Sequence, residues 1–291
     1  MNRLFLHIPR TGGSSIWRGL AEAAAASGMQ IIDIYDVSVS KFGDPGHTSE
    51  ALAQIPDLQL ERERLFHHHS WDSPLAQLPD ALVATVVRDP VDRMVSELMH
   101  YRRVLAAGML PQRHVQYIGE TLGGPLTEML SDAQRPMHDV VLAAAQLPLY
   151  QRYYLRFFEQ FLGPYTSARR TRSLASRLVD PLHRRLAGAA EHLAQAACEA
   201  FHRIEFRDVP TAFRAIAEGF GLPVGAQGLS FHINRSPDRF DGEAQLREHL
   251  RRSLDEDYAF LAAMSRRGKA RARIGAPQSA AVPGALSSSS R

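Results

Sequence analysis

Apolar residues gather in short runs over the first hundred positions, and a turn or a helix start follows most of these runs. The runs at 3–8, 30–35, 65–67 and 81–87 have the length and composition of β-strands. The last is apolar at almost every position, which is typical of a central parallel strand that is covered on both faces. Strands that alternate with helices indicate an α/β fold with a parallel sheet.

Helical spacing of apolar residues follows the first and the last of these strands. The first helix is predicted to cover Ser14 to about Ala26. The second is predicted to begin at Pro90, with Asp89 as its N-cap, and to continue through Leu98.

The rest of the chain is predicted to be mostly helical, with one return to the sheet. The predicted elements are a mainly helical segment over 107–200, a strand over 201–207, and helices over 209–220 and 246–263. Beyond residue 265 the composition changes to Arg, Ala, Gly, Pro and Ser. We therefore expect one domain over 1–264 and a disordered, basic and serine-rich tail over 265–291.

Composition and charge narrow the possible function classes. The chain has 291 residues, of which 45% are hydrophobic and 22% charged, a balance typical of globular proteins. Its net charge of +3 favours anionic ligands but is too small to indicate a nucleic-acid partner. With Cys198 as the single cysteine, neither an internal disulfide nor a cysteine-based metal site is expected. No apolar stretch has the length of a membrane span and the first strand starts at about residue 3, so we expect a soluble, cytoplasmic protein without a signal peptide.

The turn after the first strand is the first candidate for binding chemistry, and its sequence is Pro9-Arg10-Thr11-Gly12-Gly13-Ser14-Ser15. Backbone N–H groups and the helix dipole favour a phosphate at such a turn, and the glycines allow a close approach. Arg10 adds a positive charge, and three hydroxyl groups add donors. The loop lacks the Lys-Ser/Thr ending of G-x-x-x-x-G-K-[ST], which disfavours ATP and GTP.

A second candidate follows the run at 81–87, with the sequence Arg88-Asp89-Pro90-Val91-Asp92-Arg93-Met94-Val95-Ser96. Ligands of open parallel sheets bind beyond the carboxyl ends of the strands, so Arg88 and the glycine loop are expected to face one crevice. The fork of an arginine suits a phosphate. The alternative role for Arg88 is an ion pair with Asp89 or Asp92.

Together the two motifs resemble those of the PAPS-dependent sulfotransferase superfamily, in the carbohydrate branch similar to heparan sulfate 2-O-sulfotransferases. That family shows P-K-T-G-[GS]-[ST]-S after the first strand and R-D-P-x-x-R-x-x-S after a later one. The resemblance implies a three-layer, P-loop-like fold, 3′-phosphoadenosine 5′-phosphosulfate (PAPS) as the donor, and a hydroxyl group as the acceptor, expected on a saccharide.

The resemblance also implies roles for individual residues. Residues Arg10 to Ser15 would bind the 5′-phosphosulfate, while Arg88 and Ser96 would bind the 3′-phosphate. The family's lysine is replaced by Arg10, which keeps the electrostatic role at the leaving phosphate but is unsuited to donate a proton.

The run His67-His68-His69 is the candidate for the base. A His-x-His segment supplies the base in the resembled family, which implies His69 as the base and His67 as its support. On an extended chain these two side chains point one way and His68 the other, which leaves His68 as the alternative base. A histidine near its ordinary pKa accepts a proton at neutral pH. A metal site and a solvated loop are the competing roles, and since no supporting ligand lies at a suitable spacing, we expect no metal.

Two weaker motifs complete the predicted site. The segment 230–237 resembles a polar, basic family loop that touches the nucleotide, with Arg235 and Ser236 as candidates, although an ordinary loop before a helix has the same composition. The aromatic residues of 149–154 would either stack on a sugar or pack in the core, and packing is favoured.

The sequence leaves two other functions open. A kinase-like phosphotransferase would need a Lys-Ser/Thr loop ending and a magnesium-binding carboxylate after a strand. A non-catalytic nucleotide- or glycan-binding protein of the same fold is favoured by the Arg10 replacement.

Overall fold

The fold is built on a five-stranded parallel sheet with the strand order β2-β3-β1-β4-β5. The computed structural model describes residues 1–42, 48–55, 63–69, 72–78, 80–108, 112–172, 190–206, 208–224 and 243–274. The strands are β1 (Asn2–Leu6), β2 (Gln30–Asp33), β3 (Arg64–His68), β4 (Leu82–Val86) and β5 (Arg203–Glu205). The α/β class with a parallel sheet is confirmed.

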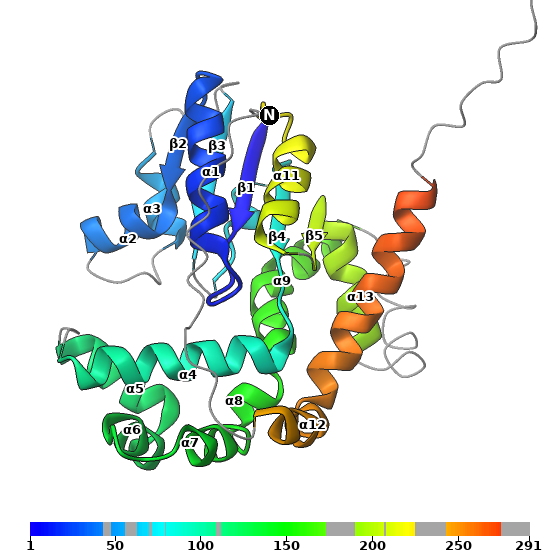
Figure 1. Cartoon of the computed structure of the whole chain (residues 1–291). Helices are drawn as coiled ribbons and strands as arrows, with labels where there is room; N and C mark the ends of the chain where they lie inside the picture. The colour runs from blue at the N-terminus through cyan, green and yellow to red at the C-terminus, as the bar shows by residue number, and fades with distance from the viewer. Residues whose placement is uncertain are drawn as a thin grey trace, which may run out of the picture.

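The central strand β1 brings the two sequence motifs to one edge of the sheet. It pairs with β3 on one side and β4 on the other, and Leu6 is opposite His68 and Thr85 in the two registers. The three strands are parallel, so the segments that follow them leave from the same edge (Figure 1).

Helices cover both faces of the sheet and make a three-layer arrangement (Figure 1). On one face Phe5 and Leu65 pack against α1 (Gly13–Ala26) and α11 (Val209–Gly219). On the other, Leu4 and Phe66 pack against α9 (Tyr153–Arg172), a helix over 190–200, and α13 (Asp255–Ile274). Neighbouring residues of a strand thus enter different cores, as the alternation of side chains requires.

A second group of helices lies beyond the carboxyl edge of the sheet and has its own apolar core (Figure 1). These helices are α4 (Pro90–Ala106), α5 (Gln112–Leu122), α6 (Gly124–Ser131), α7 (Met137–Ala144), α8 (Pro148–Gln151) and α12 (Glu243–Ser253). The remaining short elements are α2 (Ile34–Phe42), α3 (Thr48–Ala53) and the 3-10 turn η1 (Pro74–Ala76). The predicted helical character of 107–200 is confirmed for its described residues.

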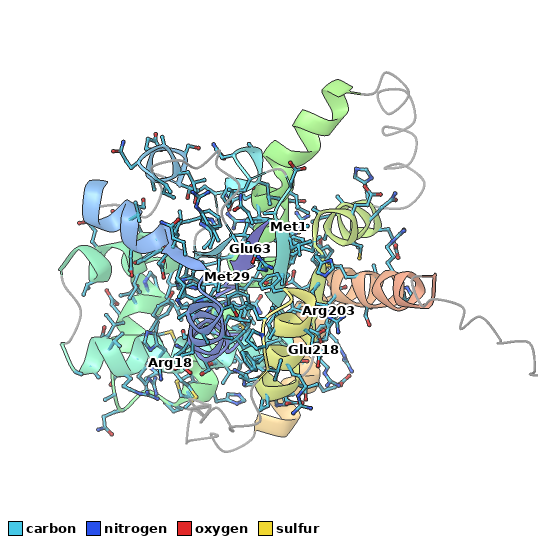
Figure 2. The ribbon with its side chains drawn as sticks, turned by 90° about the horizontal axis from the view of Figure 1, so that it is seen from above. Met1, Arg18, Met29, Glu63, Arg203 and Glu218 are labelled. Carbon is cyan, nitrogen blue, oxygen red and sulfur yellow. The ribbon has the colours of Figure 1, made fainter. Side chains whose placement is uncertain are left out.

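The opposite, amino-terminal edge of the sheet is closed by contacts around Arg3. Its Nε donates to the carbonyl oxygen of Phe220 at 2.5 Å, and its Nη2 lies 3.4 Å from a carboxylate oxygen of Glu63. Figure 2 looks down on this edge, where Met1 and Glu63 lie close together; their charged groups are 4.0 Å apart. The two sequence motifs lie at the other, carboxyl edge of the sheet.

Several predicted boundaries differ from the structure. The strand at 30–35 ends at Asp33, where α2 takes over, and the helix predicted over 246–263 is two helices that meet near Leu254. Helix α13 continues to Ile274, past residue 265, where the tail was predicted to start. Residues 275–291 lie outside the described part of the chain.

Two further observations concern the bulk of the chain. Cys198 packs against the core beneath the sheet, as expected for a helix packing position. Across the described residues, no helix combines the length and the apolar character needed to cross a bilayer.

Candidate functional site

The loop between β1 and α1 turns sharply at Gly12. This residue is the N-cap of α1 with φ of +88°, and its carbonyl accepts from the N–H groups of Ser15 and Ile16 at 3.2 and 3.3 Å. A Cβ atom at Gly12 would lie 2.5 Å from a methyl carbon of Val209, so glycine is required by both conformation and space. The Thr11 hydroxyl donates to the carbonyl of Ile8 at 2.8 Å and holds the turn rather than presenting a donor. The first N–H groups of α1 thus open at the carboxyl edge of the sheet.

Arg10 connects this loop to the second motif. It is the non-glycine residue with a positive φ, +67°, in the described chain. Its Nη2 lies 3.4 Å from Oγ of Ser96 on α4, and Arg88 Nη1 lies 3.4 Å from the Arg10 carbonyl oxygen. Both motifs therefore meet at one place, as the sequence predicted.

The charges around Arg10 are mostly positive. Burial lowers the pKa of Arg10, Glu97 raises it, and the nearby cations Arg103 and Arg88 lower it further. An arginine remains a cation at neutral pH despite such shifts. The Nε of Arg10 is buried and has no hydrogen-bond partner among the described residues. A bound anion near these side chains would relieve the repulsion among the cations.

The two carboxylates proposed as alternative partners of Arg88 have other contacts. Asp89 accepts from the N–H of Asp92 at 3.1 Å and from the hydroxyl of Tyr258 at 2.7 Å. Asp92 is ion-paired with Arg247 of α12. Within the described residues, Arg88 is exposed and makes no ion pair with either of them. This geometry leaves the Arg88 guanidinium available to a ligand.

The other arginine of the second motif, Arg93, has a structural position. Its guanidinium is buried, with its carbon 3.3 Å from the centre of the Tyr153 ring and Nη1 3.3 Å from Glu97. Tyr150 and Tyr154 are buried beside it. The prediction that the aromatic residues of 149–154 pack in the core is confirmed.

Three histidines lie together on the other side of the glycine loop. They line a pocket of about 520 Å³. His7 follows β1, His67 belongs to β3 and His69 follows it. The ring centres of His7 and His69 are 4.3 Å apart, and those of His7 and His67 are 5.4 Å apart. The other residues that line the pocket are Ser14, Trp17, Arg18, Ala21, Glu22, Asp33, Tyr35 and Asp36.

A hydrogen-bonded chain links two of these histidines, His67 and His7, to Asp33 at the end of β2. Nδ1 of His67 lies 2.6 Å from Oδ2 of Asp33, and Nε2 of His67 lies 3.3 Å from Nδ1 of His7. Trp17 of α1 stacks on the His67 ring with a centroid distance of 4.5 Å. Burial alone would raise the pKa of Asp33, but the hydrogen bond and charge of His67 outweigh it and lower that pKa.

The pKa values of His7 and His69 differ from the ordinary value assumed from the sequence. Burial, followed by the effects of His67 and His68, lowers the pKa of His69 to about 4. Burial also lowers the pKa of His7 well below 6.5, helped by His69, His67 and Arg10. Both rings are therefore neutral at pH 7, and the lowered pKa values make them weaker bases than an exposed histidine.

His68 lies apart from this cluster. Its side chain is 1% exposed, and its Nε2 lies 2.6 Å from the carbonyl oxygen of Asp72. The expected alternation of the three histidines is confirmed, and it turns His68 away from the pocket, which argues against His68 as the base.

Gly13 of the glycine loop is in direct contact with the pocket residue His7. A Cβ atom built on Gly13 would lie 2.0 Å from Cδ2 and 2.6 Å from Nε2 of His7, so the edge of this ring rests against the start of α1. Ser14 lines the pocket from the same turn. Arg10 does not line it, because its guanidinium is directed toward Ser96.

Sequence reasoning missed four members of the site: His7, Asp33, Trp17 and Tyr35. A signal was present for two of them, since His7 and Asp33 are polar residues near the ends of apolar strands. The predicted nucleotide-contacting residues Arg235 and Ser236 lie outside the described residues. Among the residues that the structure describes, no group of three or more His, Cys, Asp or Glu is arranged to hold a metal ion. No family model, curated protein or solved structure matches this chain.

Proposed function

We propose that this protein is a sulfotransferase that moves the sulfuryl group of PAPS to a hydroxyl group, with a saccharide as the expected acceptor. The observation that carries the proposal is the junction of the two motifs. Arg10, Arg88 and Ser96 converge at the carboxyl ends of β1 and β4, next to a pocket lined by His7, His67 and His69. The parallel sheet with order β2-β3-β1-β4-β5 and the helices on both of its faces are compatible with the P-loop-like fold that the motifs imply.

The binding roles follow from the charges at the junction. The N–H groups at the start of α1, with Ser14 and Ser15, suit the 5′-phosphosulfate. Arg88 and Ser96 suit the 3′-phosphate. Arg10 lies beside Ser96, so it contributes to the 3′ side as well, and its buried Nε supplies a donor without a partner among the described residues.

The chemistry requires in-line attack and stabilisation of the charge that grows on the leaving phosphate oxygen. The helix start and the positive side chains supply this stabilisation. A neutral histidine of the pocket takes the proton of the acceptor hydroxyl. His69 is the most exposed of the three and is the base that the resemblance implies.

Binding of the desulfated product, 3′,5′-adenosine bisphosphate, tests the donor class. We expect calorimetry to show tighter binding of this nucleotide than of ATP. Charge-assisted hydrogen bonds contribute about 1.5–3 kcal/mol, so Arg88→Ala should weaken binding by about 10-fold or more, and Arg10→Ala should act in the same direction. Arg252→Ala removes the same charge from an exposed side chain of α12 and is the matched control.

Equal or tighter binding of ATP would contradict the proposal and favour the kinase-like alternative. A transfer assay with sulfur-labelled PAPS and a panel of glycans and small alcohols then tests catalysis. Bisphosphate binding without transfer to any acceptor of the panel would favour the non-catalytic binding protein.

A further inference from the structure

The pocket holds a hydrogen-bonded chain that the resemblance does not supply: Asp33, His67 and His7 in series, from three adjacent strands of the sheet. Asp33 ends β2, His67 belongs to β3 and His7 follows β1. His7 is 6% exposed and yet lines the pocket, with its Nε2 beside Gly13. The chain therefore runs from a carboxylate to the glycine loop.

The hydrogen bonds restrict where the protons can lie. The lowered pKa of Asp33 keeps it ionised, so it only accepts, and Nδ1 of His67 must carry a proton. The bond between Nε2 of His67 and Nδ1 of His7 needs one proton, and we assign that proton to Nδ1 of His7. In this assignment, neutral His7 has a free electron pair on Nε2, the nitrogen that lies beside Gly13.

We propose that Nε2 of His7, rather than His69, is the base that accepts the proton of the acceptor hydroxyl, and that His67 and Asp33 position and stabilise it. This inference rests on the proposed function for the identity of the reaction. Its account of the proton positions rests on the hydrogen bonds and on an ionised Asp33, and it does not depend on the reaction.

The step balances in atoms and charge. The acceptor oxygen forms its bond to sulfur while its proton moves to Nε2 of His7. The bond between sulfur and the bridging phosphate oxygen breaks, and its electron pair leaves with the bisphosphate product. The Nδ1 proton of His7 passes to Nε2 of His67, so the positive charge comes to rest on His67, next to the carboxylate of Asp33.

The environments of the two candidate histidines favour His7. Burial and neighbouring cations disfavour a charge on either ring, but His7 can pass its charge to the His67–Asp33 pair. His69 stacks on His7 and contacts Tyr35, and it has no hydrogen bond to a carboxylate within the described residues. His69 therefore serves as a wall of the pocket that keeps the His7 ring in its plane.

The first test reads the tautomers and does not depend on activity. Long-range nitrogen–proton NMR spectra at pH 7 distinguish a histidine protonated on Nδ1 from one protonated on Nε2. We expect both His7 and His67 to be protonated on Nδ1 in the free protein. A His7 ring protonated on Nε2 would overturn the proposal.

The second test separates the base from a merely structural histidine. In His7→Asn the side-chain amide stands near the position of Nδ1 and retains a donor for His67, but the atom that accepts the proton is gone. General-base catalysis contributes about 100- to 10,000-fold, so kcat should fall by at least about 100-fold. The affinity for 3′,5′-adenosine bisphosphate should stay within about 3-fold, because His7 does not bind the phosphates.

His69→Asn is the matched variant, since it makes the same replacement in the ring stacked on His7. We expect a loss in kcat of less than about 10-fold for it. Asp33→Asn should lower kcat by about 100-fold and change the tautomer signal of His67 while the nucleotide affinity is retained. A larger loss for His69→Asn than for His7→Asn would overturn the proposal.

The proposed function and this inference fail in different ways. Absence of bisphosphate binding and of transfer refutes the sulfotransferase, while the NMR result still decides the proton positions. Transfer that survives His7→Asn refutes His7 as the base and leaves the sulfotransferase intact.

Discussion

The contact between Gly13 and the His7 ring joins the two halves of the candidate site. The glycine starts α1, and the ring edge occupies the space of the absent side chain. Position 13 therefore requires glycine, because any side chain there would occupy the space of the His7 ring.

Gly13→Ala should therefore destabilise the protein although alanine favours helices. The added methyl group would overlap the His7 ring, and overpacking of this kind costs about 1–3 kcal/mol. Gly119→Ala in α5 is the control, because nothing lies within 4 Å of the added atom and the helix gains up to about 1 kcal/mol. Urea unfolding measures both. Equal stability of Gly13→Ala and the wild type would show that the ring has room to move.

Residue-level prediction from the sequence succeeded where a residue belonged to a contiguous motif. The two motifs of Arg10, Arg88 and Ser96 were expected to lie together, and these side chains contact one another through Arg10. His7 and Asp33 were missed because each touches His67 from a different strand, and only the sheet order β2-β3-β1 makes them neighbours. The direction of the Arg10 side chain also depends on its positive φ, which the sequence does not reveal.

Among the elements, α4 links the sheet to the helical group below it. Asp89 caps the helix, and its second carboxylate oxygen accepts from Tyr258 of α13. The residue just before this cap is Arg88, so the cap also determines where the Arg88 main chain leaves the sheet.

Asp89→Ala should lower the free energy of unfolding by about 2 kcal/mol, about 1 for the cap and about 1 for the bond to Tyr258. Asp208→Ala removes the N-cap of α11, which accepts from the N–H of Thr211 at 3.1 Å, and should cost only about 1 kcal/mol. Only the first variant should also weaken the binding of 3′,5′-adenosine bisphosphate. Thermal unfolding and calorimetry provide the measurements, and equal effects of the two variants would contradict this role of Asp89.

The elements themselves were largely predictable, because apolar runs and caps are local signals. Asp89 and Pro90 mark the start of α4 as expected. The break between α12 and α13 was missed, since the buried residues Leu250 and Leu254 keep helical spacing across it. Three acidic residues in the first turn of α13, favourable at a helix start, were the available signal.

For the molecule as a whole, Asp257 of α13 connects the site to a distant part of the chain. Its two carboxylate oxygens accept from the N–H groups of Tyr154 and Leu155 at 3.0 and 3.1 Å, at the start of α9. The hydroxyl of Tyr154 in turn accepts from the N–H of Arg88 and donates to its carbonyl oxygen. The position of Arg88 thus depends on a helix far along the chain.

Asp257 should make the stability of the protein fall as the pH rises through about 6. Burial raises the pKa of this carboxyl to about 6, above the value near 3.9 of an unfolded chain. Its contribution is therefore fully present below about pH 4 and is lost as the folded protein is forced to ionise it. The unfolding free energy of the wild type minus that of Asp257→Asn should drop by a few kcal/mol, on the order of 1.4 per pKa unit, between pH 4 and pH 7.

Denaturant unfolding at several pH values measures this difference. Asp255→Asn, an exposed change on the same helix, controls for the altered charge at the helix start. A difference that stays constant or rises with pH would contradict the burial of an uncharged carboxyl at this position.

The path from Asp257 through Tyr154 to Arg88 has a consequence for how the protein is made. During translation the N-terminal part of the chain, with Arg10, Arg88 and the three pocket histidines, leaves the ribosome first. Nearly all of the recognisable motifs lie in this part. The support for the Arg88 main chain emerges only with α13, after most of the chain has been synthesised. A nascent or truncated chain that ends before α13 would therefore carry all of these motifs and still lack the support that holds the Arg88 main chain.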